Sequence, residues 1–118
     1  MKVVRIRPEG RRPADGAMFR GAVRIQEALG AADTSEHRVS EVTFTDGART
    51  KLHTHTTDQL LVITAGLGVV GTRDERHEVT AGDVVLIPKR EPHFHGAREG
   101  ADMTHLSVLG DSENRILE

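Results

Sequence analysis

The chain consists largely of short runs in which apolar and polar residues alternate, and no stretch of it predicts a long helix. In the run that begins at His37, for example, Ser40, Val42 and Phe44 fall on one face of a strand. Glycine and aspartate turns separate the runs. Roughly nine short strands at regular spacing are typical of a β-sandwich or a β-barrel, and the jelly roll belongs to that class. The sequence therefore predicts an all-β fold.

Two apolar runs stand out from this pattern. Residues Gln59 to Thr64 are apolar on both faces, which predicts a central strand that is buried on both sides. Val84 to Ile87 predict a second buried strand, which Pro88 ends. The Asp46-Gly47 pair predicts a tight turn after the strand that carries Phe44.

The two ends of the chain carry weaker signals. Val4 and Ile6 give a weak strand pattern, and residues 26–29 predict one helical turn that Gly30 ends. The polar tail from Asp111 to Glu118 is expected to fray.

Composition limits the classes of function. At 118 residues the chain is expected to form one domain, residues 1–118, and its net charge of −2 comes from scattered charges of both signs. We therefore expect no nucleic-acid partner and no membrane partner. Residues 1–7 are too charged for a signal peptide and no apolar stretch approaches the length of a membrane span, so we expect a cytoplasmic location. The chain has three Phe, no Trp, no Tyr and no Cys, so its core and any pocket should be aliphatic, and a metal site would have no thiolate ligand.

Histidines supply the candidate metal ligands. His53 and His55 are two residues apart in an extended segment, so their side chains share one face of a strand. After a short turn, Gln59 at the start of the next strand can add an amide oxygen. A second pair with the same spacing, His93 and His95, lies further along the chain. The alternative interpretation is two exposed strand ends that happen to be rich in histidine.

Other polar residues near these pairs are candidates for proton transfer or substrate binding. His95 shares a face with His93, and His105 lies on a strand that alternates, so both can point inward. Each has an alternative role, His95 as a supporting group behind the metal ligands and His105 as a buried histidine bonded to the backbone. Lys51 lies two residues before His53, so on a continuous strand its side chain would share the inward face. This predicts a cation that binds an anionic substrate or extends to the mouth of the barrel.

The remaining two histidines, His37 and His77, lie beside charged residues at strand starts, and we expect solvent to surround both.

The residues around the first histidine pair resemble the first motif of the cupin superfamily. That motif, G-x5-H-x-H-x3,4-E-x6-G, matches with every spacing kept and with Gln in place of Glu; the matching residues are Gly47, His53, His55, Gln59 and Gly66. The second cupin motif is matched at Gly82, Pro88 and His93, whereas Arg90 replaces its glycine and Ala97 its asparagine. The resemblance covers about residues 38–110. It implies a jelly-roll barrel with a short N-terminal strand extension.

A narrower resemblance is to the small bacterial cupins that include manganese-dependent hydroxynitrile lyases. Segments such as Phe19 to Ile25 and Met103 to Leu106 look like that group. The resemblance implies a metal site of three histidines and one glutamine, with two further histidines in the pocket. Carried over, the ligands are His53, His55, Gln59 and His93, and the pocket residues are His95 and His105.

The metal implied by this resemblance is manganese, although nitrogen and oxygen ligands also suit Fe, Co, Ni or Zn. The chain departs from the group at Thr56-Thr57-Asp58, where a Pro-Leu-Gly linker is usual, and at Lys89-Arg90, where Pro-Gly is usual. Phe94 stands where a Trp is usual. These differences imply an altered substrate pocket around a retained metal site.

Three functions fit these residues. The first is a lyase acting on a small oxygenated substrate, in which a metal polarises oxygen and a histidine moves a proton. The second is a metal-dependent dioxygenase, and the third a metal-binding or ligand-binding module without turnover. The resemblance also implies a homodimer, with residues 2–7 added as a strand to the partner's sheet.

Overall fold

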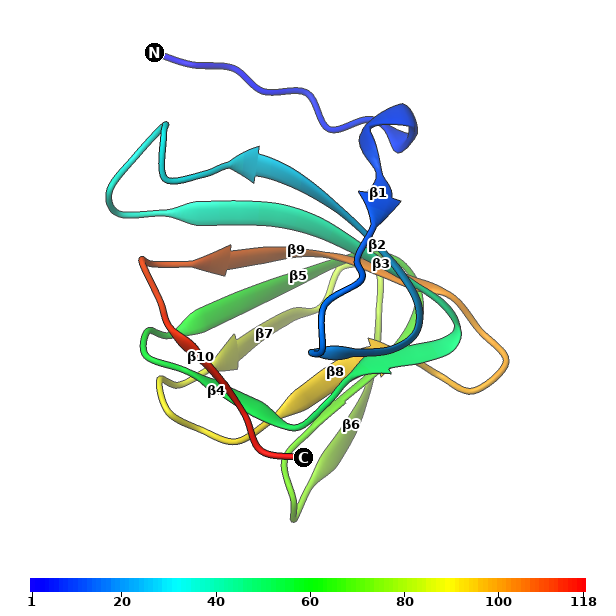
Figure 1. The fold of residues 1–118 in the computed structure, drawn as a ribbon. Helices are drawn as coiled ribbons and strands as arrows, with labels where there is room; N and C mark the ends of the chain where they lie inside the picture. The colour runs from blue at the N-terminus through cyan, green and yellow to red at the C-terminus, as the bar shows by residue number, and fades with distance from the viewer.

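The computed structural model describes all residues 1–118 and confirms the all-β prediction (Figure 1). The strands form a closed barrel with extra strands outside it. The elements in chain order are the 3-10 turn η1 (Pro8–Gly10) and the strands β1 (Arg12–Pro13), β2 (Phe19–Leu29), β3 (Arg38–Thr50), β4 (His53–His55), β5 (Gln59–Gly71), β6 (Arg76–Thr80), β7 (Val84–Ile87), β8 (Phe94–Ala97), β9 (Met103–Leu109) and β10 (Asn114–Ile116). No helix in the structure is long and apolar enough to span a membrane.

Two long strands, β3 and β5, close the barrel because each pairs with different partners along its length. The first part of β3 pairs with β9, and Arg49 near its end pairs with Gly96 of β8. The first part of β5 pairs with β7 and β9, and the second part with β6 and β8. Gly66 lies between the two parts of β5 with a φ of 79°, and a Cβ there would collide with the carbonyl oxygen of Asp102.

The predicted turn at Asp46-Gly47 is wrong in one respect, because the strand does not end there. Both residues have positive φ, 49° and 74°, but β3 continues through them to Thr50. On the neighbouring β2, Arg20 pairs with Arg49 and Ala22 pairs with Thr45, so residues 46–48 of β3 form a bulge opposite Gly21. The bulge redirects β3 toward β8, and the next segment of the chain then carries the first histidine pair.

A core of aliphatic residues with Phe44 fills the barrel, as the composition predicts. The fully buried hydrophobic side chains include Phe44, Leu61, Ile63 and Met103. Their strands alternate as expected, so the residues between them point away from the core.

The prediction that Gln59 to Thr64 is buried on both faces is wrong, and so is the prediction that Val84 to Ile87 forms a buried strand. Leu60 on β5 is 40% exposed, and Val84 and Leu86 on β7 are 65% and 61% exposed. Each strand buries only its inward side chains, because no second layer of the chain covers the outer face of the barrel.

Both chain ends differ from expectation. Residues 1–7 form no strand, and β2 continues to Leu29 where a helical turn was predicted. The tail does not fray: Asn114 to Ile116 form β10, which pairs with β4 in antiparallel register and lies beside it in Figure 1. This pairing brings the C-terminal end of the chain to the histidine strand.

Candidate metal centre

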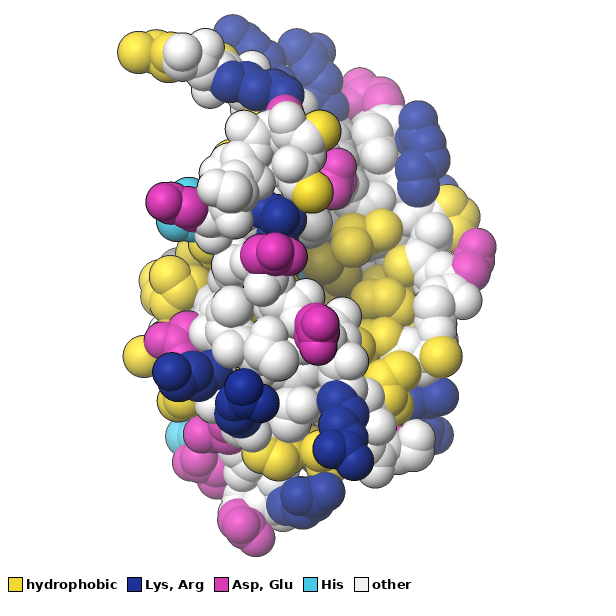
Figure 2. Space-filling view, turned by 60° about the vertical axis from the view of Figure 1, so that its left-hand side comes forward, with side chains coloured by type: hydrophobic (Ala, Val, Ile, Leu, Met, Phe, Trp, Pro, Cys, Tyr) yellow, Lys and Arg dark blue, Asp and Glu magenta, His cyan; other side chains and the backbone are white.

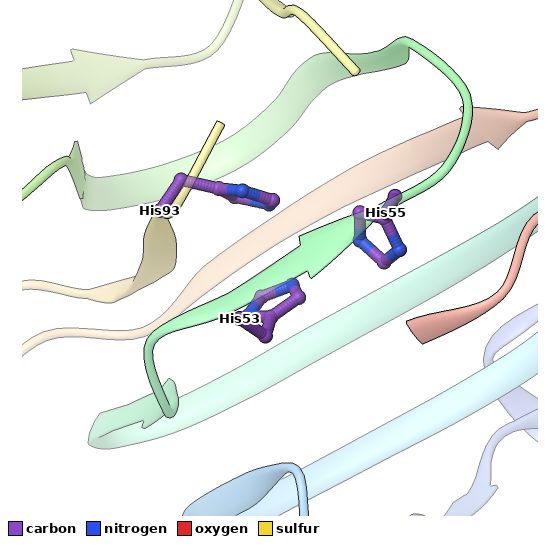
Figure 3. A group of neighbouring side chains, drawn as sticks. All are labelled: His53, His55 and His93. Carbon is purple, nitrogen blue, oxygen red and sulfur yellow. The ribbon is translucent and has the colours of Figure 1, made fainter. Parts of the chain in front are cut away.

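Three histidines from two segments converge inside the barrel (Figure 3). His53 and His55 lie on the same face of β4, as their spacing predicts. His93 precedes β8 and forms an antiparallel bridge with His53, in which each backbone N–H donates to the other's carbonyl at 3.0 Å. One nitrogen from each of the three rings lies within 4.8 Å of the others, and all three side chains are buried. The cluster can hold a metal ion.

Hydrogen bonds fix the orientation of all three rings. The Nδ1–H groups of His53 and His93 donate to the carbonyl oxygens of Lys51 and Glu91, at 2.7 and 2.8 Å. His55 donates from Nδ1 to the side-chain oxygen of Asn114 at 2.6 Å. A neutral imidazole that donates from Nδ1 has a free lone pair at Nε2, which is the atom that binds a metal. The Nε2 atom of His55 is buried and has no hydrogen-bond partner.

Gln59, the first residue of β5, presents its amide to the same cluster. Its Nε2 donates to the hydroxyl of Ser107 at 2.9 Å, which directs Oε1 toward His93. This oxygen lies 3.1 Å from Nε2 of His93. Since the Nδ1–H of His93 is used by Glu91, two lone pairs face each other here. In this arrangement a cation beside them, either a proton or a metal ion, would be bound by both acceptors.

The electrostatics of the cluster favour the metal ion over the proton. Burial, together with the charge of neighbouring His93, lowers the pKa of His53 to about 3. Burial lowers the pKa of His93 to about 4 and also lowers the pKa of His55. The rings are therefore neutral near pH 7 and ready to bind a metal. The residues thus fit a divalent ion held by neutral ligands, His53, His55, His93 and Gln59.

A second pair of histidines lies beside the cluster. Nε2 of His105 on β9 and Nδ1 of His95 on β8 are 2.9 Å apart and share one proton in a hydrogen bond. Burial lowers the pKa of His95 well below its ordinary value and that of His105 to about 4. Nε2 of His95 and Nδ1 of His105 have no partner. The pair is therefore neutral and has a free ring nitrogen at each end.

One cavity of ≈160 Å³ connects the two groups of histidines. In Figure 2 hydrophobic side chains line a hollow in the surface. The cavity is lined by Met18, Phe19, Ile25, Ser40, Val42, Thr50, His53, His55, Gln59, His95, His105, Ser107, Leu109 and Asn114. None of these side chains is a carboxylate, an ammonium or a guanidinium.

The structure thus brings together six of the seven predicted site residues and leaves one out. Lys51 is half-buried but does not line the cavity, because β3 ends at Thr50 and the strand parity is interrupted before β4 begins. Its contribution is the backbone carbonyl that orients His53. His37 and His77 are exposed, and His77 pairs with Glu75 at 3.0 Å.

Sequence reasoning missed two polar residues that form hydrogen bonds with the candidate metal ligands. Ser107 lies on the same face of β9 as His105, so the alternation of that strand already contained a signal for it. Asn114 lies in the polar tail, where no local pattern marks it as a partner of His55.

The closed barrel with a histidine cluster inside it defines a cupin. Residues 37–118 match the family described as the AraC-like ligand binding domain, and the chain belongs to that family.

Relatives and solved structures agree with this assignment. The chain is 39% identical to an (R)-mandelonitrile lyase of Granulicella tundricola over 109 residues. This alignment covers 92% of this chain and 82% of that protein. A cupin-like protein from Thermotoga maritima is 27% identical with a TM-score of 0.84, covering 89% of this chain and 83% of the other. The polyketide cyclase RemF of Streptomyces resistomycificus shares the fold at 17% identity, with a TM-score of 0.80 and coverage of 99% and 88%.

Proposed function

We propose that the chain is a metal-dependent lyase that cleaves a small α-hydroxynitrile into a carbonyl compound and hydrogen cyanide. The observation that carries this proposal is the single cavity lined both by the candidate ligands His53, His55 and Gln59 and by the His95–His105 pair. The similarity to an (R)-mandelonitrile lyase supports the same reaction class.

The residues that would hold the metal are His53, His55 and His93 through Nε2 and Gln59 through Oε1. A divalent ion held there, manganese in the lyases that this chain resembles, would supply a Lewis acid that lowers the pKa of a substrate hydroxyl group. Because every one of these ligands is neutral, none of the ion's charge is cancelled by the protein.

The His95–His105 pair moves the proton. When Nδ1–H of His95 donates to Nε2 of His105, Nε2 of His95 is free to accept the substrate's hydroxyl proton. The carbon–carbon bond to the nitrile then breaks, its electron pair leaves with cyanide, and the hydroxyl oxygen becomes a carbonyl. The imidazolium returns its proton to cyanide, so the reaction needs no oxidant or reductant.

The size and lining of the cavity fit a neutral substrate of about one ring. An apolar protein cavity of about 150 Å³ holds benzene, and this cavity measures ≈160 Å³. Because no cationic side chain lines it, the anionic substrate considered for Lys51 has no partner there.

A second candidate function is ligand binding without turnover. It is favoured by the family to which residues 37–118 belong, whose description names ligand binding. In that case the cavity and histidines would bind a small molecule, and no proton transfer would follow.

Assays in the absence of oxygen separate these functions from each other and from a dioxygenase. The manganese and iron forms are incubated with mandelonitrile and with an aromatic diol, under nitrogen and in air. We expect cleavage of mandelonitrile under nitrogen, loss of that activity in His105→Ala, and full activity in His77→Ala, where the histidine is exposed. Turnover only in air would replace the lyase by the dioxygenase. No turnover in any form would leave the binding module.

A further inference from the structure

The three histidines of the metal centre are oriented in two different ways. The acceptors for His53 and His93 are carbonyl oxygens of residues two positions earlier in the chain, Lys51 and Glu91. Those bonds form within a few residues of the ligand itself. The acceptor for His55 is a side chain from the other end of the sequence, Asn114, the only asparagine in the chain.

The position of Asn114 depends on the short sheet that β10 forms with β4. In its register Asn114 lies opposite His55 and Ile116 opposite His53. Backbone bonds continue on both sides, from Thr56 N to Glu113 O at 3.2 Å and from Leu117 N to Leu52 O at 2.9 Å. The sheet therefore places the amide opposite the ring.

Side chains hold both ends of β10. Before it, the hydroxyl of Ser112 accepts from Thr56 N at 3.0 Å. After it, Leu117 packs against the cluster of Leu52, Val69 and Phe94. The last residue, Glu118, pairs with Arg20 at 3.1 Å and Arg49 at 3.4 Å.

We propose that Asn114 is a positioning residue for the metal, which acts by holding the imidazole of His55 in the tautomer and rotation that direct Nε2 into the cluster. The inference rests on the metal site of the proposed function. With its oxygen toward the ring, the amide of Asn114 accepts from Nδ1, so the proton stays on that nitrogen and the lone pair on Nε2. Outer partners of this kind typically account for 10–100-fold in metal affinity.

Asn114 also lines the cavity, so the same side chain contacts a ligand of the metal and faces the substrate space. Asn114 therefore links the position of the C-terminal strand to the orientation of one imidazole, that of His55, and not to those of His53 and His93. Loss of the amide should leave His53 and His93 oriented and weaken binding without abolishing it.

The experiment measures Mn²⁺ affinity of Asn114→Ala, Asn114→Asp and Arg115→Ala by titration calorimetry. We expect a 10–100-fold loss in Asn114→Ala and affinity at or above that of the unmodified protein in Asn114→Asp, which keeps an acceptor. Arg115 is the matched control, because it is exposed, lies on the same strand opposite Thr54 and does not line the cavity. Equal affinity in Asn114→Ala would overturn the proposal, as would an equal loss in Arg115→Ala, which would mean that the strand matters and the amide does not.

A second measurement is independent of metal binding. Long-range ¹H–¹⁵N spectra of the metal-free protein report the tautomer of each imidazole. We expect the Nδ1–H form at His55 in the unmodified protein and a mixture in Asn114→Ala, with His53 and His93 unchanged in both. An unchanged His55 signal in Asn114→Ala would refute the positioning role. If no metal binds to the unmodified protein, the proposed function fails, and these spectra still decide the role of Asn114.

Discussion

His53 and His93 donate a backbone N–H to each other's carbonyl oxygen at 3.0 Å, so two candidate metal ligands from distant parts of the chain are joined through their main chains. The bridge holds their rings with centroids 4.3 Å apart. Preorganisation of this kind means that binding a metal requires little rearrangement of the backbone. It also means that the two rings can be removed without removing the bridge.

The first prediction concerns the ligand histidines. His53→Ala and His93→Ala should each lower metal affinity by more than about 100-fold, since even loss of an outer partner costs 10–100-fold. Elemental analysis of dialysed protein measures the remaining metal. His37→Ala and His77→Ala are the matched controls, because both side chains are exposed. Full occupancy in either ligand variant would exclude that histidine from the site.

The second prediction concerns Gln59. Gln59→Glu should keep the ion and tighten its binding by on the order of tenfold or more, because a carboxylate adds a negative charge beside the cation. Ser107 can turn its hydroxyl to donate to the new carboxylate, so no buried group loses its partner. The same charge should reduce Lewis acidity and slow the proposed cleavage.

Gln26→Glu is the control for that substitution, because Gln26 bonds to the backbone of Arg7 outside the cavity. Calorimetry and the electron paramagnetic resonance spectrum of bound Mn²⁺ measure both variants. An unchanged affinity together with an unchanged spectrum in Gln59→Glu would place Gln59 outside the metal's coordination shell.

The third prediction is the pH dependence of stability without metal. Burial lowers the pKa of His53 to about 3 and those of His93 and His105 to about 4, from an ordinary value of 6.5. Between these values the unfolded chain binds more protons than the folded one. The free energy of unfolding should therefore be highest above pH 6.5 and fall as pH falls, by about 1.4 kcal/mol per pH unit for each such histidine.

Denaturant unfolding of chelator-treated protein across this pH window checks the slope. His105→Leu removes one of the titrating groups and should flatten the dependence. Stability that does not change with pH would mean that these histidines are solvated in the folded protein.

The fourth prediction is a homodimer, which the structure of one chain does not test. The outer face of β5, β7 and β9 carries two cross-strand rows of aliphatic side chains; these are Val108, Leu60 and Leu86 in one row and Leu106, Val62 and Val84 in the other. Strand β7 pairs only with β5, so its second edge has no strand beside it. Residues 1–7, with exposed Met1, Val3 and Val4, belong to no strand. An apolar face and an open edge of this kind suit the N-terminal segment and sheet of a second copy.

Light scattering at micromolar protein measures the mass. We expect a dimer for the unmodified chain and a monomer for Leu86→Lys. Leu67→Lys is the control, because Leu67 is exposed on the part of β5 that pairs with β6. A monomeric unmodified protein, or a dimer that Leu86→Lys leaves intact, would contradict this assignment.

Several features followed from the sequence because they depend on short-range geometry. Side chains two residues apart on a strand share a face whatever the rest of the fold does, so the relation of His53 to His55 was predictable. The same rule placed Met103, His105 and Ser107 together on β9. It failed at Lys51, because the strand is interrupted between Thr50 and His53 and parity does not carry across a break.

By itself, then, the sequence determined the all-β class, the aliphatic core and the local pairs of histidines, since strand period and composition act over a few residues. Tertiary structure alone decided that Asn114 reaches His55, that β10 is ordered and that Leu60 and Leu86 lie exposed. These depend on which strands pair, in which register, and on what covers each face. Such relations are set by the free energy of the whole barrel, so no local pattern in the chain records them.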